Sequence, residues 1–374
     1  MSQQFKPSSA FWGVLACASY AVPSALAGGQ PYLLKDIRPD AERSIPFQLT
    51  VVGTLVFFTA IDGVTGFELW VTDGTAQGTH LVKDIIPGSG TASYPRALTA
   101  VGSRLFFQVD DGVNGTELWV SDGTSPGTYL VKDINPTGDS EPSDRLGNGE
   151  PMTAWNGRAI FAAEDGVHGR ELWVSDGTLA GTFIVRDIRP GSPDGDPWFL
   201  TDVGAFFLFS ANATGVGREL WRSDGTTATT VLLRDIWPGG NGFPYLLVNV
   251  NGTVFFKADD APSNDELWKS DGTVSGTVKV KEIHPTTGSE PFFLTNVDGT
   301  LFFPPTTPTT TSNFGKAMEQ SRVPFESPTL IPTGGHSRNL RSVEFSTADF
   351  SLKQTTACTA WKSGSPMVRR QVPT

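Results

Sequence analysis

One octapeptide pattern, Glu-Leu-Trp-x-x-Asp-Gly-Thr, occurs five times in this chain and constrains its fold more than any other feature. Its five tryptophans are Trp70, Trp119, Trp173, Trp221 and Trp268. Subtracting their numbers gives spacings of 49, 54, 48 and 47 residues. Each copy is followed by a short, mostly apolar segment of the type Leu81-Val82-Lys83-Asp84-Ile85. The recurrence predicts a repeat architecture, because roughly 40–50 residues is the period of propeller blades.

Within one repeat, runs of aromatic and β-branched residues alternate with turns rich in glycine. In the first repeat these runs cover residues 47–52, 55–60, 67–72 and 79–85. Such runs between Gly and Asp turns predict β-strands, and four antiparallel strands with short turns form one propeller blade. The doubled Phe57-Phe58 places one ring on each face of a strand. This pattern predicts that both faces of each sheet are covered by neighbouring sheets.

Two incomplete repeats flank the five complete ones. Residues 31–39 have the form of a last strand without a preceding motif, and Pro291–Phe303 supplies the first two strands of a sixth unit. A propeller leaves no free sheet edge when its N-terminal strand completes the last blade. We therefore predict an all-β propeller of about six four-stranded blades over residues 28–303, with Leu33–Ile37 as the closing strand.

The N-terminus has the features of a secretory signal peptide. Lys6 provides the charged region, an apolar segment follows, and Ala25-Leu26-Ala27 is a small-x-small cleavage site. The apolar segment is too short for a dependable membrane span. We expect residues 1–27 to be removed and the protein to be secreted or held at the cell surface. A lipoprotein signal at Cys17 is the alternative.

Residues 304–374 contain no element of the repeat. They begin with the Pro- and Thr-rich run 304–311, which is typical of a linker or of disorder. We predict a disordered C-terminal tail. Two origins stay open, a genuine interaction segment or an out-of-frame extension of a longer repeat protein.

Charge and cysteine content exclude several classes of function. The formal net charge is −11, which argues against nucleic-acid binding and against anionic membrane surfaces. The two cysteines, Cys17 and Cys358, lie in the predicted leader and tail. Removal of the leader leaves one cysteine, so we expect neither an internal disulfide nor a zinc site.

The five motif copies and their Leu-Val-Lys-Asp-Ile segments resemble the bacterial ELWxxDGT repeat family, often labelled hyalin-like. The resemblance covers about residues 31–303 and is specific, because the octapeptide recurs in register. It implies a secreted or surface-anchored β-propeller protein. It implies no catalytic role for any residue.

Charged residues inside the repeated strands are candidates for chemistry. Glu68, Lys83 and Asp84 have counterparts in nearly every repeat. A catalytic site breaks the symmetry of a repeat, whereas structural residues follow it. We therefore predict an ion-pair and hydrogen-bond network within each blade, and no enzyme activity.

The aspartates of the Asp-Gly-Thr turns are the candidate metal ligands. They are Asp73, Asp122, Asp176, Asp224 and Asp271. An Asp in this place stabilises its own turn by accepting downstream backbone N–H groups. Calcium is the alternative, although one carboxylate per turn supplies few of the oxygen ligands that calcium requires. We expect no other cofactor.

Aromatic residues that break the repeat pattern are the candidate ligand-binding residues. The motif tryptophans recur at one strand position, so we expect them to pack the blades. Trp198, Trp237 and Tyr245 instead lie in or beside the segments that join repeats, where propellers often bind ligands.

These observations favour a non-enzymatic extracellular or cell-surface protein, a scaffold or adhesion module. We expect a monomer whose partner is a surface glycan or an envelope protein. A carbohydrate- or calcium-binding, lectin-like propeller is one alternative. A propeller hydrolase or lyase is the second, and it would require unrepeated acids that converge on one site.

Overall fold

The computed structural model describes residues 31–40, 42–87, 93–143, 152–282 and 288–303. The predicted signal peptide and the whole of the predicted tail lie outside these residues, so neither prediction is tested. None of the described residues is helical, and hence none forms a helix that could cross a membrane.

The described residues form five four-stranded antiparallel sheets and one two-stranded sheet. The first blade comprises β1 (Phe47–Val52), β2 (Leu55–Ile61), β3 (Phe67–Thr72) and β4 (His80–Lys83). The second comprises β5 (Arg96–Val101), β6 (Arg104–Asp110), β7 (Thr116–Ser121) and β8 (Tyr129–Lys132). The third comprises β9 (Thr153–Trp155), β10 (Arg158–Glu164), β11 (Arg170–Ser175) and β12 (Phe183–Arg186). The fourth comprises β13 (Trp198–Asp202), β14 (Phe207–Ala213), β15 (Gly217–Ser223) and β16 (Val231–Arg234). The fifth comprises β17 (Tyr245–Val250), β18 (Thr253–Asp259), β19 (Asp265–Ser270) and β20 (Val278–Lys279). The two-stranded sheet comprises β21 (Thr295–Val297) and β22 (Thr300–Phe302).

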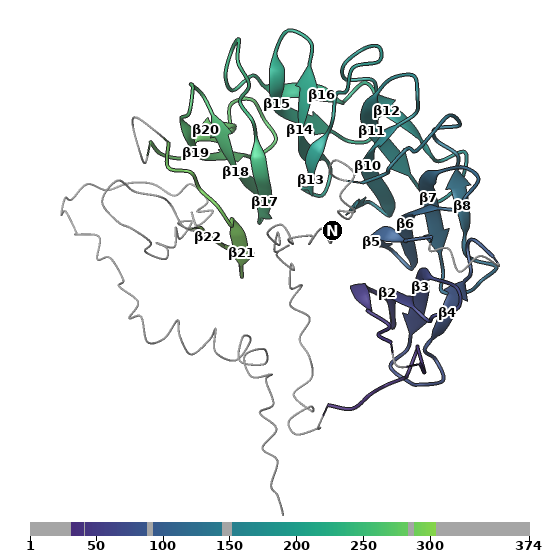
Figure 1. The fold of residues 1–374 in the computed structure, drawn as a ribbon. Helices are drawn as coiled ribbons and strands as arrows, with labels where there is room; N and C mark the ends of the chain where they lie inside the picture. Colours follow the sequence, from purple (N-terminus) through teal and green to yellow (C-terminus); the bar gives the residue numbers. More distant parts are fainter. Residues whose placement is uncertain (1–30, 41, 88–92, 144–151, 283–287, 304–374) are drawn as a thin grey trace, which may run out of the picture. The chain divides into compact units, whose positions relative to one another are not determined.

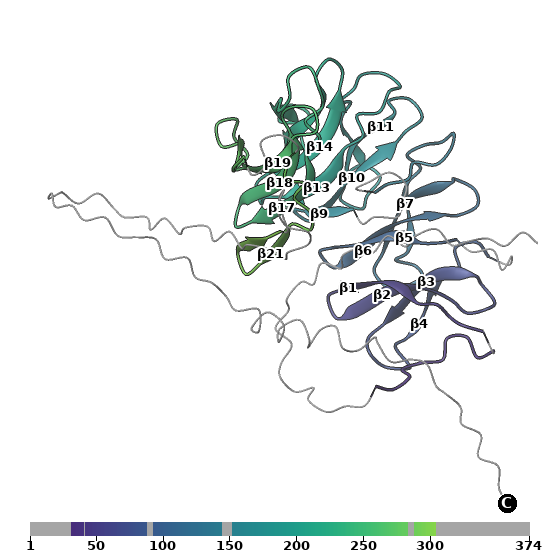
Figure 2. The same cartoon turned by 60° about the vertical axis from the view of Figure 1, so that its left-hand side comes forward.

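Each four-stranded sheet is a meander in which every strand pairs with the next strand of the chain (Figure 1). The first strands of consecutive sheets lie beside one another, from β1 and β5 through to β17 and β21. Strand order and neighbouring first strands together are the arrangement of propeller blades. The predicted all-β propeller class is therefore confirmed, and Figure 2 shows the same blades from a second direction.

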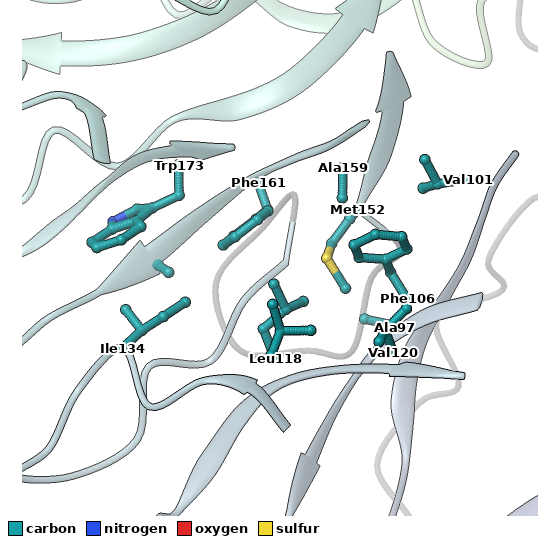
Figure 3. Close-up of a cluster of buried hydrophobic side chains, with 12 residues drawn as sticks. Ala97, Val101, Phe106, Leu118, Val120, Ile134, Met152, Ala159, Phe161 and Trp173 are labelled. Atoms are coloured by element: carbon teal, nitrogen blue, oxygen red, sulfur yellow. The ribbon is translucent and has the colours of Figure 1, made fainter. Parts of the chain in front are cut away.

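The apolar core lies between consecutive blades. Phe106 and Phe107 are adjacent residues of β6, and both are fully buried. Phe107 packs against the first blade beside Phe57, whereas Phe106 packs against the third blade beside Phe161 (Figure 3). Burying one such ring stabilises the fold by roughly 1.5–3 kcal/mol. Each blade therefore depends on both of its neighbours, as the doubled phenylalanines predict.

The Asp-Gly-Thr turns need a glycine for a conformational reason. Gly123 has a φ of +93°, a value that a side chain disfavours strongly. The same turn brings Gly123 close to the first blade, where an added Cβ would lie 3.2 Å from Leu55. The turn and the packing of neighbouring blades thus both require the motif glycine.

The predicted closing strand is not observed among the described residues. Residues 33–37 form no strand and no bridge, and β21 and β22 pair only with each other among the described residues. In the complete blades the fourth strand pairs with the third. The described part of the sixth unit has two strands, so it contains no third strand with which a closing strand could pair.

Residues 31–40 nevertheless contact the first blade as a preceding fourth strand would. The Lys35 ammonium donates a hydrogen bond to the Thr79 carbonyl oxygen at 2.5 Å. Ile37 packs on Phe58 and Trp70. The segment therefore covers the outer face of the first blade without joining a sheet.

Candidate functional site

The glutamate of every motif copy is fully buried. These residues are Glu68, Glu117, Glu171, Glu219 and Glu266. Glu117 accepts hydrogen bonds from the backbone N–H groups of Ile134 at 2.9 Å and Asn135 at 3.2 Å. It also accepts one from the Ser140 hydroxyl at 2.6 Å. The carboxylate thus connects its own strand to the loop after the fourth strand and to the approach to the next blade.

The other glutamates repeat this pattern. Glu171 accepts bonds from the N–H groups of Ile188 and Gly195, both at 2.9 Å. Glu219 accepts them from Ile236 at 2.7 Å and Gly242 at 2.6 Å. Since the same backbone groups are bonded in successive blades, these carboxylates have a structural role.

Burial raises the pKa of Glu68, Glu117, Glu171 and Glu219 to about 7, although their hydrogen bonds oppose the shift. A raised pKa in a carboxylate often marks a catalytic acid. Here the shift recurs in four blades and the groups are sealed from solvent. The raised pKa therefore reflects the construction of the blade rather than one reactive centre.

In the first four blades no ion pair among the described residues joins the motif glutamate to the basic residue or the aspartate of the segment that follows it, whereas in the fifth blade Glu282 pairs with Lys279 at 2.6 Å. Lys83 donates to the Thr128 carbonyl oxygen of the next blade at 2.8 Å and lies 5.5 Å from the Trp119 ring centroid. Lys132 makes the corresponding bond to Thr182 at 3.0 Å. The backbone N–H groups satisfy the glutamates, so the lysines reach outward to the following blade instead.

The turn aspartates are held by their own turns. Asp122 accepts hydrogen bonds from the Thr124 N–H at 2.8 Å and from its hydroxyl at 2.7 Å. The bond from the Thr124 hydroxyl lowers the pKa of the Asp122 carboxyl most, and the bond from the Thr124 N–H lowers it further. The five aspartates belong to five different sheets. No group of three or more His, Cys, Asp or Glu residues in the described part of the chain is placed to hold a metal ion.

Two of the three predicted ligand-binding aromatics come together. The rings of Trp198 and Tyr245 are stacked, with centroids 5.9 Å apart and planes at 25°. The Arg218 guanidinium lies 3.7 Å from the Trp198 centroid, and Trp198 Nε1 donates to Asp196 at 2.9 Å. Both rings are half-buried, so this cluster joins the fourth and fifth blades.

Trp237 lies apart from this cluster. Its indole packs on its own loop at Gly240, where an added Cβ would lie 2.4 Å from a ring carbon. It forms no ring pair with a described residue. The three predicted residues therefore do not form one platform.

Sequence reasoning missed a loop that precedes the first strand of each unit. Each loop has a proline at its centre, and the residue before that proline has a φ between +41° and +51°. Those residues are Ile45, Tyr94, Glu141, Asp196, Phe243 and Glu290. Each loop is a three-residue segment that runs from the residue with positive φ to the residue after the proline. We call these six segments the junction loops. A positive φ is unusual outside glycine. All six loops adopt it although their residues differ, so the backbone conformation is repeated while the side chains vary.

A polar pocket of about 170 Å³ opens at the second junction loop. Its lining includes Tyr94, Arg96, Gln108, Asp110, Thr116 and Glu141. These residues come from two junction loops and from β6 and β7. Aligning the six prolines in the sequence would have marked Tyr94 and Glu141 as variable positions, whereas Gln108 could be found only from the packing.

No known protein family and no curated protein matches the chain. Its structure is similar to that of TolB from Acinetobacter baumannii, at 11% identity and a TM-score of 0.34 over 67% of this chain and 60% of that one. Oligopeptidase B from Leishmania major is 10% identical, with a TM-score of 0.42 over 69% and 37% of the two chains. A puromycin hydrolase is 14% identical, with a TM-score of 0.30 over 75% and 52%.

The chain spans less than two thirds of each of these proteins. The assignment of propeller blades rests on the strand order and the packing described above. The resemblance to the ELWxxDGT repeat family stays a prediction.

Proposed function

We propose that the chain is a non-enzymatic extracellular or cell-surface protein that acts as a scaffold or adhesion module. One observation carries the proposal. The acids of the repeat are bonded in the same way in successive blades, as the Ile134 bond of Glu117 and the Ile188 bond of Glu171 show. A protein that uses its acids to build identical blade junctions is suited to presenting a rigid surface.

The unrepeated carboxylate of Asp196 also has structural partners. Asp196 is paired with Arg218 at 2.8 Å and accepts the Trp198 N–H. Burial raises the pKa of Asp196, while Arg218 lowers it. This carboxylate is held in a packed junction and is a poor candidate for the acid of a hydrolase or lyase.

Location and partners are inferred from the sequence. The predicted signal peptide at residues 1–27 would direct the chain out of the cytoplasm. A net charge of −11 suits a neutral glycan or an envelope protein with a basic surface better than it suits an acidic polymer. A monomer presenting the variable junction loops would be sufficient for such a contact.

The proposal is tested by binding of the purified chain without its predicted leader. Envelope and polysaccharide fractions are incubated with the protein, with and without a chelator. We expect saturable binding that the chelator leaves intact and no breakdown of the bound material. Binding abolished by the chelator would favour the calcium-dependent alternative and implicate the turn aspartates. Breakdown of a glycan or peptide that stops on changing one unrepeated acid would contradict the proposal.

A further inference from the structure

The residue at the start of each third strand, one before the motif glutamate, occupies the space beside the junction loops. These residues are Phe67, Thr116, Arg170, Arg218 and Asp265. The repeat thus places four different kinds of side chain in five equivalent positions. The contacts of these five residues differ, and in one blade the space beside the junction loops stays open.

Arginine fills this space in the third and fourth blades. Arg170 donates to the Glu141 carbonyl oxygen at 2.9 Å and to the Ser143 hydroxyl at 2.7 Å. Arg218 donates to the carbonyl and carboxylate oxygens of Asp196, at 2.9 and 2.8 Å. Both arginines are at least nine-tenths buried. The space between two junction loops is therefore one that a guanidinium group fits.

Other side chains close the space in the first and fifth blades. Phe67 stacks on Tyr94, with ring centroids 5.2 Å apart, and also contacts Phe47. Asp265 forms an ion pair with Lys257. In four of the five complete blades the chain thus fills the position itself.

The second blade has Thr116 at this position, and the side chain of Thr116 is too short to fill it. The pocket of about 170 Å³ lies here. Gln108 lines the pocket and is only 2% exposed, and its amide makes no hydrogen bond with a described residue. An amide that lines the pocket in this way is available to bind a ligand.

The acidic side chain of the next junction loop is common to the pocket and to the surroundings of Arg170. Glu141 has the same position relative to Thr116 as Asp196 has relative to Arg170. In both cases the acidic residue begins the junction loop that leads into the next blade. Asp196 lies 3.9 Å from the Arg170 guanidinium. Glu141 and Asp110 form no ion pair with a described residue. Two carboxylates thus line a space that accepts a guanidinium elsewhere in the same chain.

We propose that the second-blade pocket binds a guanidinium group that comes from outside the chain. The group takes the place of the missing arginine side chain, between the Tyr94 carbonyl and the Glu141 carboxylate. Arg96, which lies 5.8 Å from the Tyr94 ring centroid, stands at the same pocket and pairs with a carboxylate on the ligand where there is one. This inference rests on the pocket alone and is independent of the proposed scaffold function.

The test is calorimetric titration of the chain with L-arginine and with an arginine tripeptide blocked at both ends. The decisive variant is Thr116→Arg, which supplies the chain's own guanidinium as Arg170 and Arg218 do. We expect this variant to fold with an unchanged or higher melting temperature and to lose binding. Glu141→Gln should weaken binding about tenfold or more, because a charge-assisted hydrogen bond is lost.

Glu290→Gln is the matched control, because Glu290 holds the same place in the sixth junction loop and does not line the pocket. It should leave the affinity unchanged. Binding of free arginine alone indicates a small molecule whose carboxylate meets Arg96, whereas binding of both probes indicates an arginine side chain of a protein. The inference is overturned if citrulline binds as well as arginine. It is also overturned if the original chain binds neither probe better than Thr116→Arg does.

Discussion

At the scale of single residues, the motif glutamate combines two opposing requirements. Its carboxylate is sealed from water, which favours the protonated form, while backbone N–H groups favour the ionised form. Glu117 shows both effects, with complete burial and bonds to Ile134 and Ser140. The balance leaves the carboxyl with a pKa of about 7, so stability must respond to pH near neutrality.

We predict that the free energy of unfolding decreases as the pH rises from about 5 to about 7. Four carboxyls have folded-state pKa values of about 7, above their ordinary value of 4.5. In this interval the unfolded chain has lost these protons while the folded chain retains them, so each increase in pH favours unfolding. Below the ordinary pKa of 4.5, which applies to the unfolded chain, the stabilisation by these four protonated carboxyls is fully present. Denaturant titrations at several pH values measure the slope.

The contribution of one residue is isolated by Glu117→Gln. Removing one of the four groups should reduce the slope by at most about a quarter, because Asp259, whose pKa burial raises to about 6, also contributes. Glu164→Gln, at an exposed position of β10, is the control and should leave the slope unchanged. A stability that stays level between these pH values would contradict the prediction.

At the scale of strands and turns, the sequence is informative wherever side chains decide the structure. The predicted strands 47–52, 55–60, 67–72 and 79–85 correspond to β1–β4 with shifts of one or two residues at their ends. Alternation, doubled phenylalanines and Asp-Gly turns are local signals, and they were sufficient for the blades. The glycine of each such turn is the part of this signal that can be tested directly.

We predict that Gly177→Ala destabilises the protein by about 2 kcal/mol or more. Gly177 has a φ of +81°, and an added Cβ would lie 2.6 Å from the Arg104 guanidinium and 3.0 Å from the Phe106 ring. Gly53→Ala is the matched control, since Gly53 has a φ of +61° with nothing within 4 Å. Gly53→Ala should reduce the free energy of unfolding only through the strain of a positive φ, by about 1–2 kcal/mol. Equal losses in chemical denaturation would show that the contact with Arg104 and Phe106 is unimportant.

The junction loops and the pocket could not be predicted from local signals. A residue before proline is expected to be extended, yet Tyr94 and Glu141 have positive φ values. The loop is held in this form by contacts with the preceding blade, such as the bond from the Tyr94 N–H to the Phe67 carbonyl oxygen. Likewise, Lys83 reaches Thr128 across 45 residues, and only the packed structure relates them. Trp198 and Tyr245 were identifiable because they interrupt the repeat.

At the scale of the whole molecule, the sixth unit is incomplete in the described residues. Leu294, Leu301 and Phe303 cover the fifth blade, so β21 and β22 protect its core. The described part of this unit ends at Phe303 after two strands, and residues 33–37 pair with no described strand. Their contacts with the first blade are nevertheless those of a fourth strand.

We predict that inserting a copy of residues 257–277 after Phe303 allows residues 33–37 to pair. The copy continues the second strand of the sixth unit into a third strand, as in the fifth blade. The backbone amides of residues 33–37 should become protected in hydrogen exchange, and the melting temperature should rise. An insertion of the same residues in scrambled order is the control. Unchanged exchange rates at residues 33–37 would show that they cannot serve as a fourth strand.

Lys35 and the basic side chains that end the fourth strands of the first three blades make the same contact. Lys35, Lys83, Lys132 and Arg186 each donate to a threonine carbonyl in the blade that follows. Each of the first three blades thus presents the same connector to its successor and receives the same one from its predecessor. A unit can therefore be duplicated or lost by recombination within the gene without a new interface having to evolve. The number of units is free to vary among descendants, while the pocket of the second blade, which depends on one threonine, is specific to its place.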